Sequence, residues 1–143
     1  MKRSIICVFI IVLASLFVVA CGGDGDSSET ETEPVTLSFD AEEPFAYNPS
    51  SASVPAGVRV TINFNNVGAL EHTWGLADSD VDPATATEED LIPGTYSGAV
   101  PQGESTAFSF PALAPGAYQI ICTIPGHAVG GMLGTFTVTN DGS

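Results

Sequence analysis

Apolar and polar residues alternate along short stretches of the chain from residue 35 onward, and this pattern most constrains the fold. Four stretches show it most clearly: residues 58–64, 106–110, 118–122 and 136–138. A period of two places alternate side chains on opposite faces of a β-strand, so the pattern predicts half-buried antiparallel strands. Turn signals of proline and glycine separate these strands, at residues 55–57, 101–103 and 115–116.

Several short strands within residues 35–143 predict an all-β domain, and their number and spacing favour a β-sandwich. The stretch 78–100 departs from the alternation because it is acidic and contains Pro83 and Pro93. It has room for one short helix. Thr87 is a suitable N-cap, and Glu88 and Glu89 suit the positive end of a helix dipole in the first turn.

The charge of the chain excludes several classes of partner. Its 143 residues contain three Lys or Arg and seventeen Asp or Glu, which gives a formal net charge of −14. Nucleic-acid recognition requires clustered basic residues, so no nucleic-acid partner is expected. The same imbalance opposes docking of the protein surface on anionic lipid headgroups. A hydrophobic content of 44% excludes a wholly disordered chain.

The N-terminus has the organisation of an export signal. Lys2 and Arg3 precede an almost wholly apolar stretch, residues 5–20, of signal-peptide length. The stretch ends in Val-Val-Ala-Cys at residues 18–21, which resembles a bacterial lipobox with lipid attachment at Cys21. The alternative is an ordinary signal peptide, or a short membrane anchor, with an incidental cysteine.

We therefore divide the chain into three parts. Residues 1–20 are a lipoprotein signal peptide, residues 21–34 are the lipidated Cys21 with a disordered acidic tether, and residues 35–143 are the folded domain. The tether contains only small, polar and acidic residues after Cys21, and such a composition cannot form a core. This reading predicts an exported protein, anchored by lipid to the outer face of the cell membrane or on the periplasmic side.

The residues able to bind a soft metal are few and closely spaced. After the signal segment and Cys21, they are Cys122, His127 and Met132, in the spacing Cys-x4-His-x4-Met, and His72 upstream. Two His, one Cys thiolate and a weak axial Met form the ligand set of blue-copper electron-transfer sites. Taken singly, each residue has an ordinary alternative, such as a buried structural thiol or a methionine in the core. Together they predict one copper ion that cycles between Cu(I) and Cu(II).

The predicted strands explain how these residues meet. Cys122 falls on the inward face of its strand beside Ile120, where its thiolate would be shielded from solvent. The following loop returns to a second strand near Gly134 and would supply three ligands from one turn. His72, on a different strand, would fasten that loop to the sandwich.

The segment 117–138 resembles the C-terminal copper loop of the cupredoxins, the small blue copper proteins. Its spacing is nearer to that of the auracyanins and their azurin-like relatives than to plastocyanin, and residues 65–74 resemble the segment that carries the first His ligand. The resemblance implies a cupredoxin-like Greek-key β-sandwich. It also implies a distant axial contact from the backbone carbonyl of Glu71, and a role for Thr73 in orienting the site around Cys122. Thr73 stands where azurins usually have Asn, and the chain has no cysteine left for the azurin disulfide.

The same resemblance implies how electrons enter and leave. His127 would present its ring edge to solvent, and Pro125, Ala128, Val129 and Met132 would surround that edge with an apolar docking patch. The partners would be redox proteins of a respiratory or photosynthetic chain: cytochrome c, a bc-type complex or its alternative, an oxidase or a reaction centre. The protein would act as a monomer and would not be an enzyme.

These residues predict a membrane-tethered electron shuttle, and other functions would require different ligands or a different site. A copper nitrite reductase or multicopper oxidase needs a second copper centre, and the chain has only two histidines to supply ligands. A CuA site needs a second cysteine near Cys122. A copper-binding or delivery lipoprotein without redox turnover would use the same ligands and is the remaining alternative, whereas a structural adhesion domain would not need them.

The lipobox reading predicts the behaviour of one variant. Cys21→Ala removes the thiol to which the lipid would be attached, so we expect the protein to leave the membrane fraction or to accumulate unprocessed. Fractionation and metabolic labelling with a fatty acid measure this. Lipid labelling that is unchanged in Cys21→Ala would refute the interpretation of residues 18–21 as a lipobox.

Overall fold

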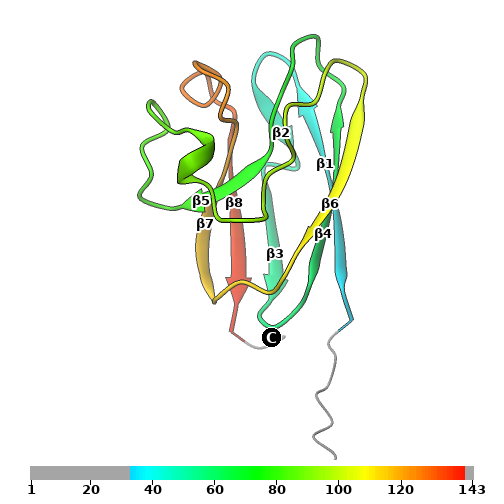
Figure 1. Cartoon of the computed structure of the whole chain (residues 1–143), viewed down its shortest axis with the longest axis vertical. Coiled ribbons are helices and arrows are strands. Elements are labelled where there is room, and N and C mark those ends of the chain that lie inside the picture. The colour runs from blue at the N-terminus through cyan, green and yellow to red at the C-terminus, as the bar shows by residue number, and fades with distance from the viewer. Residues whose placement is uncertain (1–32, 141–143) are drawn as a thin grey trace, which may run out of the picture.

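A computed structural model describes residues 33–140, which form two four-stranded sheets packed face to face (Figure 1). The first sheet has the order β2-β1-β4-β6, made of β1 (Val35–Glu42), β2 (Ala46–Asn48), β4 (Val60–Asn66) and β6 (Ser105–Phe110). The second has the order β3-β8-β7-β5, made of β3 (Ser51–Pro55), β5 (Gly75–Asp78), β7 (Gly116–Ile121) and β8 (Leu133–Thr139). The all-β Greek-key sandwich is thereby confirmed. The predicted signal peptide, Cys21 and nearly all of the tether lie outside the described residues.

Two strand pairs are parallel, so the prediction of antiparallel strands was wrong for them. β1 pairs in parallel with β4, and β3 pairs in parallel with β8. The reason is the path of the chain. After the β1–β2 hairpin the chain crosses to the second sheet as β3, and it returns to the first sheet as β4 in the direction of β1. This path places the β1–β2 connection beside the connection that follows β4 (Figure 1).

The core between the sheets follows the alternation seen in the sequence. Every second residue of β4, beginning at Val60, is buried. Five aromatic side chains are fully buried in the core: Phe39, Phe64, Trp74, Phe110 and Phe136. Burial of a side chain of this size contributes about 1.5–3 kcal/mol, so these residues supply much of the force that holds the two sheets together.

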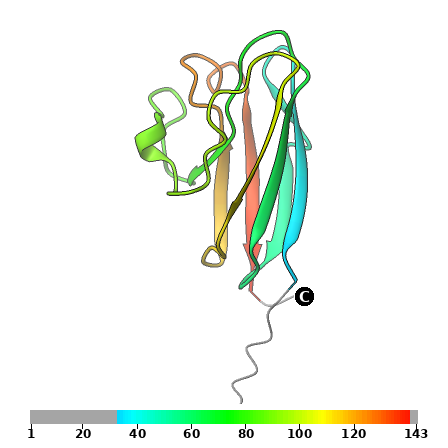
Figure 2. The same ribbon diagram turned by 45° about the vertical axis from the view of Figure 1, so that its right-hand side comes forward.

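The stretch 78–100 folds over the outer face of the second sheet (Figure 2). Its expected short helix is a single 3-10 turn, η1 (Glu88–Asp90), whose preceding Thr87 donates its amide and hydroxyl to the Asp90 carboxylate at 2.8 and 2.9 Å. Leu91 packs in a second buried cluster with Ala77, Ile121 and Ala128. Ile121 is therefore fully buried, although the alternation alone predicts a half-buried strand there.

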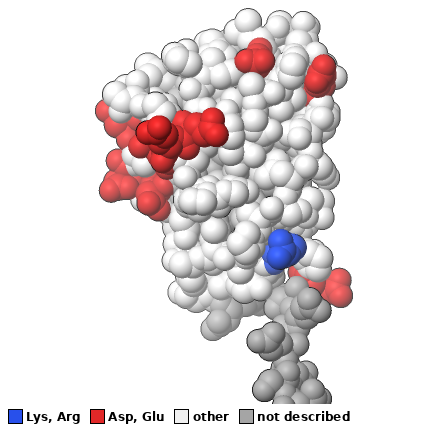
Figure 3. Space-filling view, in the orientation of Figure 1, with Lys and Arg blue, Asp and Glu red and all other residues white. Residues whose placement is uncertain are grey.

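Charge is distributed unevenly over the described surface (Figure 3). Acidic residues gather on the stretch that covers the second sheet: Asp78, Asp80, Asp82, Glu88, Glu89 and Asp90. Arg59 is the one Lys or Arg of residues 33–140. It precedes β4 at the end of the sandwich where β1 begins. Within the same residues, no helix is long and apolar enough to cross a membrane.

The packing of the second cluster predicts that two side-chain substitutions within residues 78–100 destabilise the protein to different extents. Leu91 is 8% exposed, whereas Val81, in the same stretch, is only partly buried against the cluster. Leu91→Ala should lower the free energy of unfolding by about 2–4 kcal/mol, because it removes most of a buried side chain. Val81→Ala should lower the free energy of unfolding by clearly less. Chemical denaturation measures both, and equal costs would contradict this packing.

Candidate metal centre

The predicted ligands come together at one end of the sandwich, on two connections. Cys122 directly follows β7. Residues 123–132 connect it to β8, and this connection is called the copper loop. His72 lies in the β4–β5 connection. It was expected on a strand, but it forms only an isolated backbone pair with Val100, with N–H···O distances of 3.1 and 2.8 Å. This pair still fixes the backbone of His72, since both of its hydrogen-bonding groups are used.

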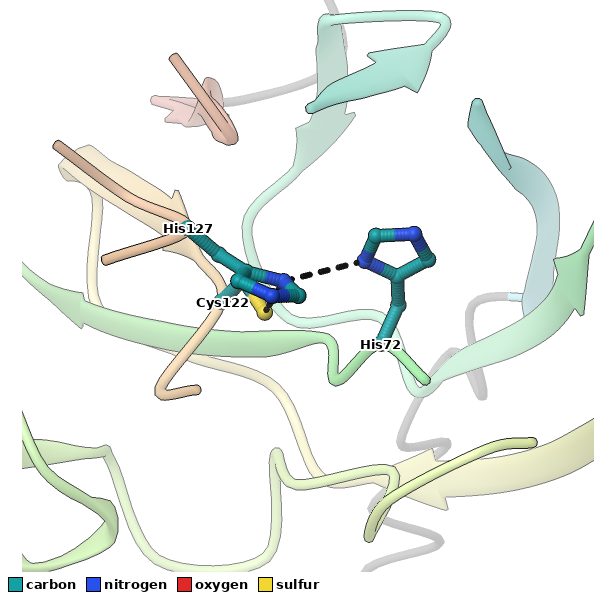
Figure 4. A group of neighbouring side chains, drawn as sticks. All are labelled: His72, Cys122 and His127. Atoms are coloured by element: carbon teal, nitrogen blue, oxygen red, sulfur yellow. Dashed lines mark hydrogen bonds between the residues drawn. The ribbon is translucent and has the colours of Figure 1, made fainter. Parts of the chain in front are cut away.

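Three donor side chains converge in the interior of this end (Figure 4). The Nδ1 atoms of His72 and His127 are 3.2 Å apart, and the Cys122 Sγ lies 3.6 Å from the His127 Nδ1. Potential ligand atoms from all three residues lie within 4.8 Å of one another. The exposed fractions are 0% for His72, 2% for Cys122 and 8% for His127. Such a set of mutually close nitrogen and sulfur donors fits a soft transition metal.

The surroundings keep both imidazoles neutral, which is the form that binds a metal. Burial, followed by the neighbouring His127, lowers the pKa of His72 below its usual value. Burial also lowers the pKa of His127. Desolvation disfavours the charged imidazolium in each case, so the nitrogen lone pairs are available near neutral pH. The donor set therefore fits a metal by its chemistry as well as by its position.

Thr73 links the two connections that carry the donors. Its amide and its hydroxyl each lie 3.5 Å from the Cys122 Sγ, and its Oγ1 also accepts the Thr123 amide at 2.9 Å. The buried Tyr47 hydroxyl donates to the Thr73 carbonyl at 2.6 Å. The amide that follows Cys122, that of Thr123, thus bonds to the Thr73 hydroxyl.

The copper loop is cross-linked by its own backbone. Met132 is fully buried, and its amide donates to the His127 carbonyl at 3.0 Å, while its carbonyl accepts the Cys122 amide at 3.4 Å. Glu71, whose side chain is exposed, immediately precedes His72. An axial contact from the Glu71 carbonyl remains a prediction from the resemblance.

Three residues that support the donors were missed by the sequence analysis. The buried Asn66 side chain donates to the carbonyls of Leu70 and Val100 at 2.6 and 2.8 Å and so fixes both backbones beside His72. The Phe45 ring packs on the His127 imidazole with 4.6 Å between centroids. The Glu43 carboxylate lies 3.8 Å from the His72 ring. Only the motif around the ligands could have drawn attention to Asn66, and nothing local marks Glu43 or Phe45.

The apolar surface around the site differs from the expected docking patch. Val129 is 66% exposed and Pro125 is exposed, but Ala128 and Met132 are buried and contribute no surface. Ala128 turns inward because it packs in the second cluster beneath residues 78–100. Val67 and Leu70, on the β4–β5 connection, are the other large hydrophobic residues exposed within residues 33–140. The exposed apolar residues thus belong to both connections at the site.

The fold and this donor set agree with comparisons of the chain with known families. A family model described as a cupredoxin-like domain matches residues 8–138. The chain belongs to the cupredoxin-like domain family. Auracyanin-B of Chloroflexus aurantiacus is 34% identical over 138 residues, which cover 84% of this chain. The match spans 58% of the length of that relative.

Solved structures of auracyanins resemble this cupredoxin over most of its length. A reduced auracyanin from Roseiflexus castenholzii superimposes with a TM-score of 0.62 at 28% identity, covering 76% of this chain and 99% of that one. Auracyanin A of Chloroflexus aurantiacus, described as a "blue" copper protein, superimposes with a TM-score of 0.61 at 28% identity. The match covers 75% of this chain and 100% of that one. Together with the His72–Cys122–His127 cluster and Met132 beside it, the family membership supports a single type 1 copper as the cofactor.

Substitutions of Thr73 test how hydrogen bonds to Cys122 set the reduction potential of the site. In Thr73→Val the sulfur loses one hydrogen bond and the Thr123 amide loses its acceptor, while Thr73→Ser keeps the hydroxyl. A hydrogen bond to the thiolate withdraws charge from it and favours Cu(I), so Thr73→Val should lower the reduction potential. The shift should be tens of millivolts, since 1.4 kcal/mol corresponds to about 60 mV for one electron. Voltammetry measures it; equal potentials in the Val and Ser variants would contradict the assignment.

Proposed function

We propose that this cupredoxin is a membrane-tethered carrier of single electrons between redox proteins of a respiratory or photosynthetic chain. The observation that carries the proposal is the buried convergence of His72, Cys122 and His127 in a cupredoxin sandwich. Its relatives include auracyanin A, which is described as a blue copper protein. A buried thiolate and two neutral imidazoles hold copper in both of its oxidation states, because thiolate suits Cu(I) and imidazole suits both.

In this proposal His72, Cys122 and His127 would be the strong ligands of the copper, Met132 would be a weaker one, and the Glu71 carbonyl would be a distant contact. The bound copper supplies a one-electron couple. The chain's own contribution is to exclude water and to hold the donors still. Hydrogen bonds from Thr73 to Cys122 and from Met132 to His127 tie the donors to both connections. The geometry of donors held in this way would change little between Cu(I) and Cu(II). A small change in geometry lowers the reorganisation energy of electron transfer.

Electrons would enter and leave through His127, which lies nearest the surface of the three donors. Pro125 and Val129 border it on the copper loop, and Val67 and Leu70 extend the apolar surface onto the β4–β5 connection. Surface of this kind suits transient partners, whose interfaces are small and apolar at the centre. A cytochrome c, a bc-type complex or its alternative, an oxidase or a reaction centre are the classes of partner that we propose.

The proposed lipid anchor at Cys21 would hold the opposite end of the sandwich towards the membrane. β1 begins at Val35, at the far end from the copper loop, and runs about 27 Å along the sandwich at ~3.4 Å for each of its eight residues. Residues 22–34 would add a leash of roughly 40 Å if extended. The site would then face away from the lipid, towards partners at the outer or periplasmic side of the membrane.

Copper delivery without redox turnover is the second candidate. A delivery protein needs a site from which the metal exchanges readily, and the donors here are at most 8% exposed. Their burial favours retention of the metal through repeated oxidation and reduction. We therefore propose that the protein is a carrier of electrons and not of copper, and that it is not an enzyme.

The absorption and EPR spectra of the copper-loaded protein test this function. We expect an intense blue band and a narrow copper hyperfine splitting, both lost in Cys122→Ser while the fold remains. Met132→Gln should keep the blue band and lower the reduction potential, because the axial ligand tunes the couple. A pale spectrum, or release of copper to a Cu(I) chelator on each reduction, would favour delivery instead.

A further inference from the structure

Glu43 lies in the β1–β2 connection, 29 positions before His72 in the chain, yet its carboxylate reaches the site. One oxygen, Oε1, accepts the backbone amides of Ala69 and Leu70 at 2.7 and 3.1 Å. These amides, the one from Ala69 foremost, lower the pKa of Glu43, so the group carries its negative charge. Two hydrogen bonds to one oxygen also fix where that charge lies.

The charge faces the ring nitrogen of His72 that points away from the other donors. Glu43 Oε1 is 3.8 Å from His72 Nε2, while His72 Nδ1 faces His127. Nε2 is buried and has no hydrogen-bond partner among the described residues. Glu43 itself is 41% exposed, so water screens part of its charge. Glu43 is therefore the charged side chain that faces this unpartnered nitrogen.

Gly68 makes the approach of Glu43 to His72 sterically feasible. A Cβ at this position would lie 2.9 Å from Glu43 Oε1 and 3.1 Å from His72 Nε2. Any side chain there would push the carboxylate and the imidazole apart. The amide of Gly68 donates to the Asn66 side-chain oxygen at 3.0 Å. This hydrogen bond fixes the position of Gly68 beside the Glu43 carboxylate and the His72 imidazole.

We propose that Glu43 is the positioning residue of His72: its carboxylate holds the ring proton on Nε2, leaves the Nδ1 lone pair free for copper, and biases the couple towards Cu(II). A carboxylate that orients the distal nitrogen of a metal-binding imidazole also makes that imidazole a stronger donor. A fixed negative charge beside a ligand stabilises the more positive metal ion. The reduction potential is therefore lower with Glu43 charged than without it. This inference rests on His72 being a copper ligand.

The tautomer has a consequence for the second histidine. Two nitrogens 3.2 Å apart need one proton between them to form a hydrogen bond. If His72 carries its proton on Nε2, the proton between the two Nδ1 atoms belongs to His127. The metal-free protein should thus contain two different tautomers, Nε2–H at His72 and Nδ1–H at His127.

Glu43→Gln tests the proposal, with Glu42→Gln as the matched control. Gln at position 43 keeps an oxygen for the Ala69 and Leu70 amides and removes only the charge. Glu42 is the adjacent acid, and its carboxylate accepts from the Asn48 side chain instead. In the copper-loaded protein, Glu43→Gln should raise the reduction potential, and by more than Glu42→Gln does. A rise that is equal in both variants would overturn the proposal, because it would reflect general surface charge alone.

Nitrogen-15 NMR of the metal-free protein gives a readout that does not depend on electron transfer. The wild type should show His72 protonated on Nε2, and Glu43→Gln should increase the population protonated on Nδ1. A wild type already protonated on Nδ1, or a tautomer unchanged in Glu43→Gln, overturns the proposal. Failure of the electron-carrier function would appear instead as a missing blue spectrum, with the metal-free tautomers as predicted.

Discussion

The contact of Thr73 with Cys122 and Thr123 is the interaction on which the site depends. It joins the β4–β5 connection, which carries His72, to the β7–β8 loop, which carries the other donors. Tyr47 adds a third element, because its buried hydroxyl binds the Thr73 carbonyl from β2. Segments from both sheets are thus tied to a single residue. Movement of either sheet relative to the other is opposed by the same few hydrogen bonds that surround the sulfur.

The donor set could be predicted from the sequence because chemistry restricts it so strongly. Beyond Cys21, the chain contains one cysteine, two histidines and one methionine, and three of these four lie within eleven residues. No other combination could bind a soft metal. The two-sheet architecture was equally accessible, because the alternation at residues 60–66 already distinguishes a buried face from an exposed one.

The supporting residues could not be predicted because they depend on which strands become neighbours. Glu43 and Phe45 reach the histidines only because β4 returns parallel to β1 and brings the two connections together. A local alternation does not specify that pairing. Ile121 shows the same limit, since its burial is caused by Leu91, thirty positions earlier. Glutamate and phenylalanine are also common residue types, whereas the ligands are rare ones.

The acidic residues of the stretch 78–90 concentrate negative charge on one side of the folded domain (Figure 3). Arg59 lies at the end remote from the copper loop. In the field of a positively charged partner, such a molecule experiences a torque as well as an attraction. The molecule is therefore oriented during the approach, before the two proteins are in contact. The orientation of the encounter is then decided over a distance of about one Debye length, ~10 Å at moderate salt, and it is lost as the ionic strength rises.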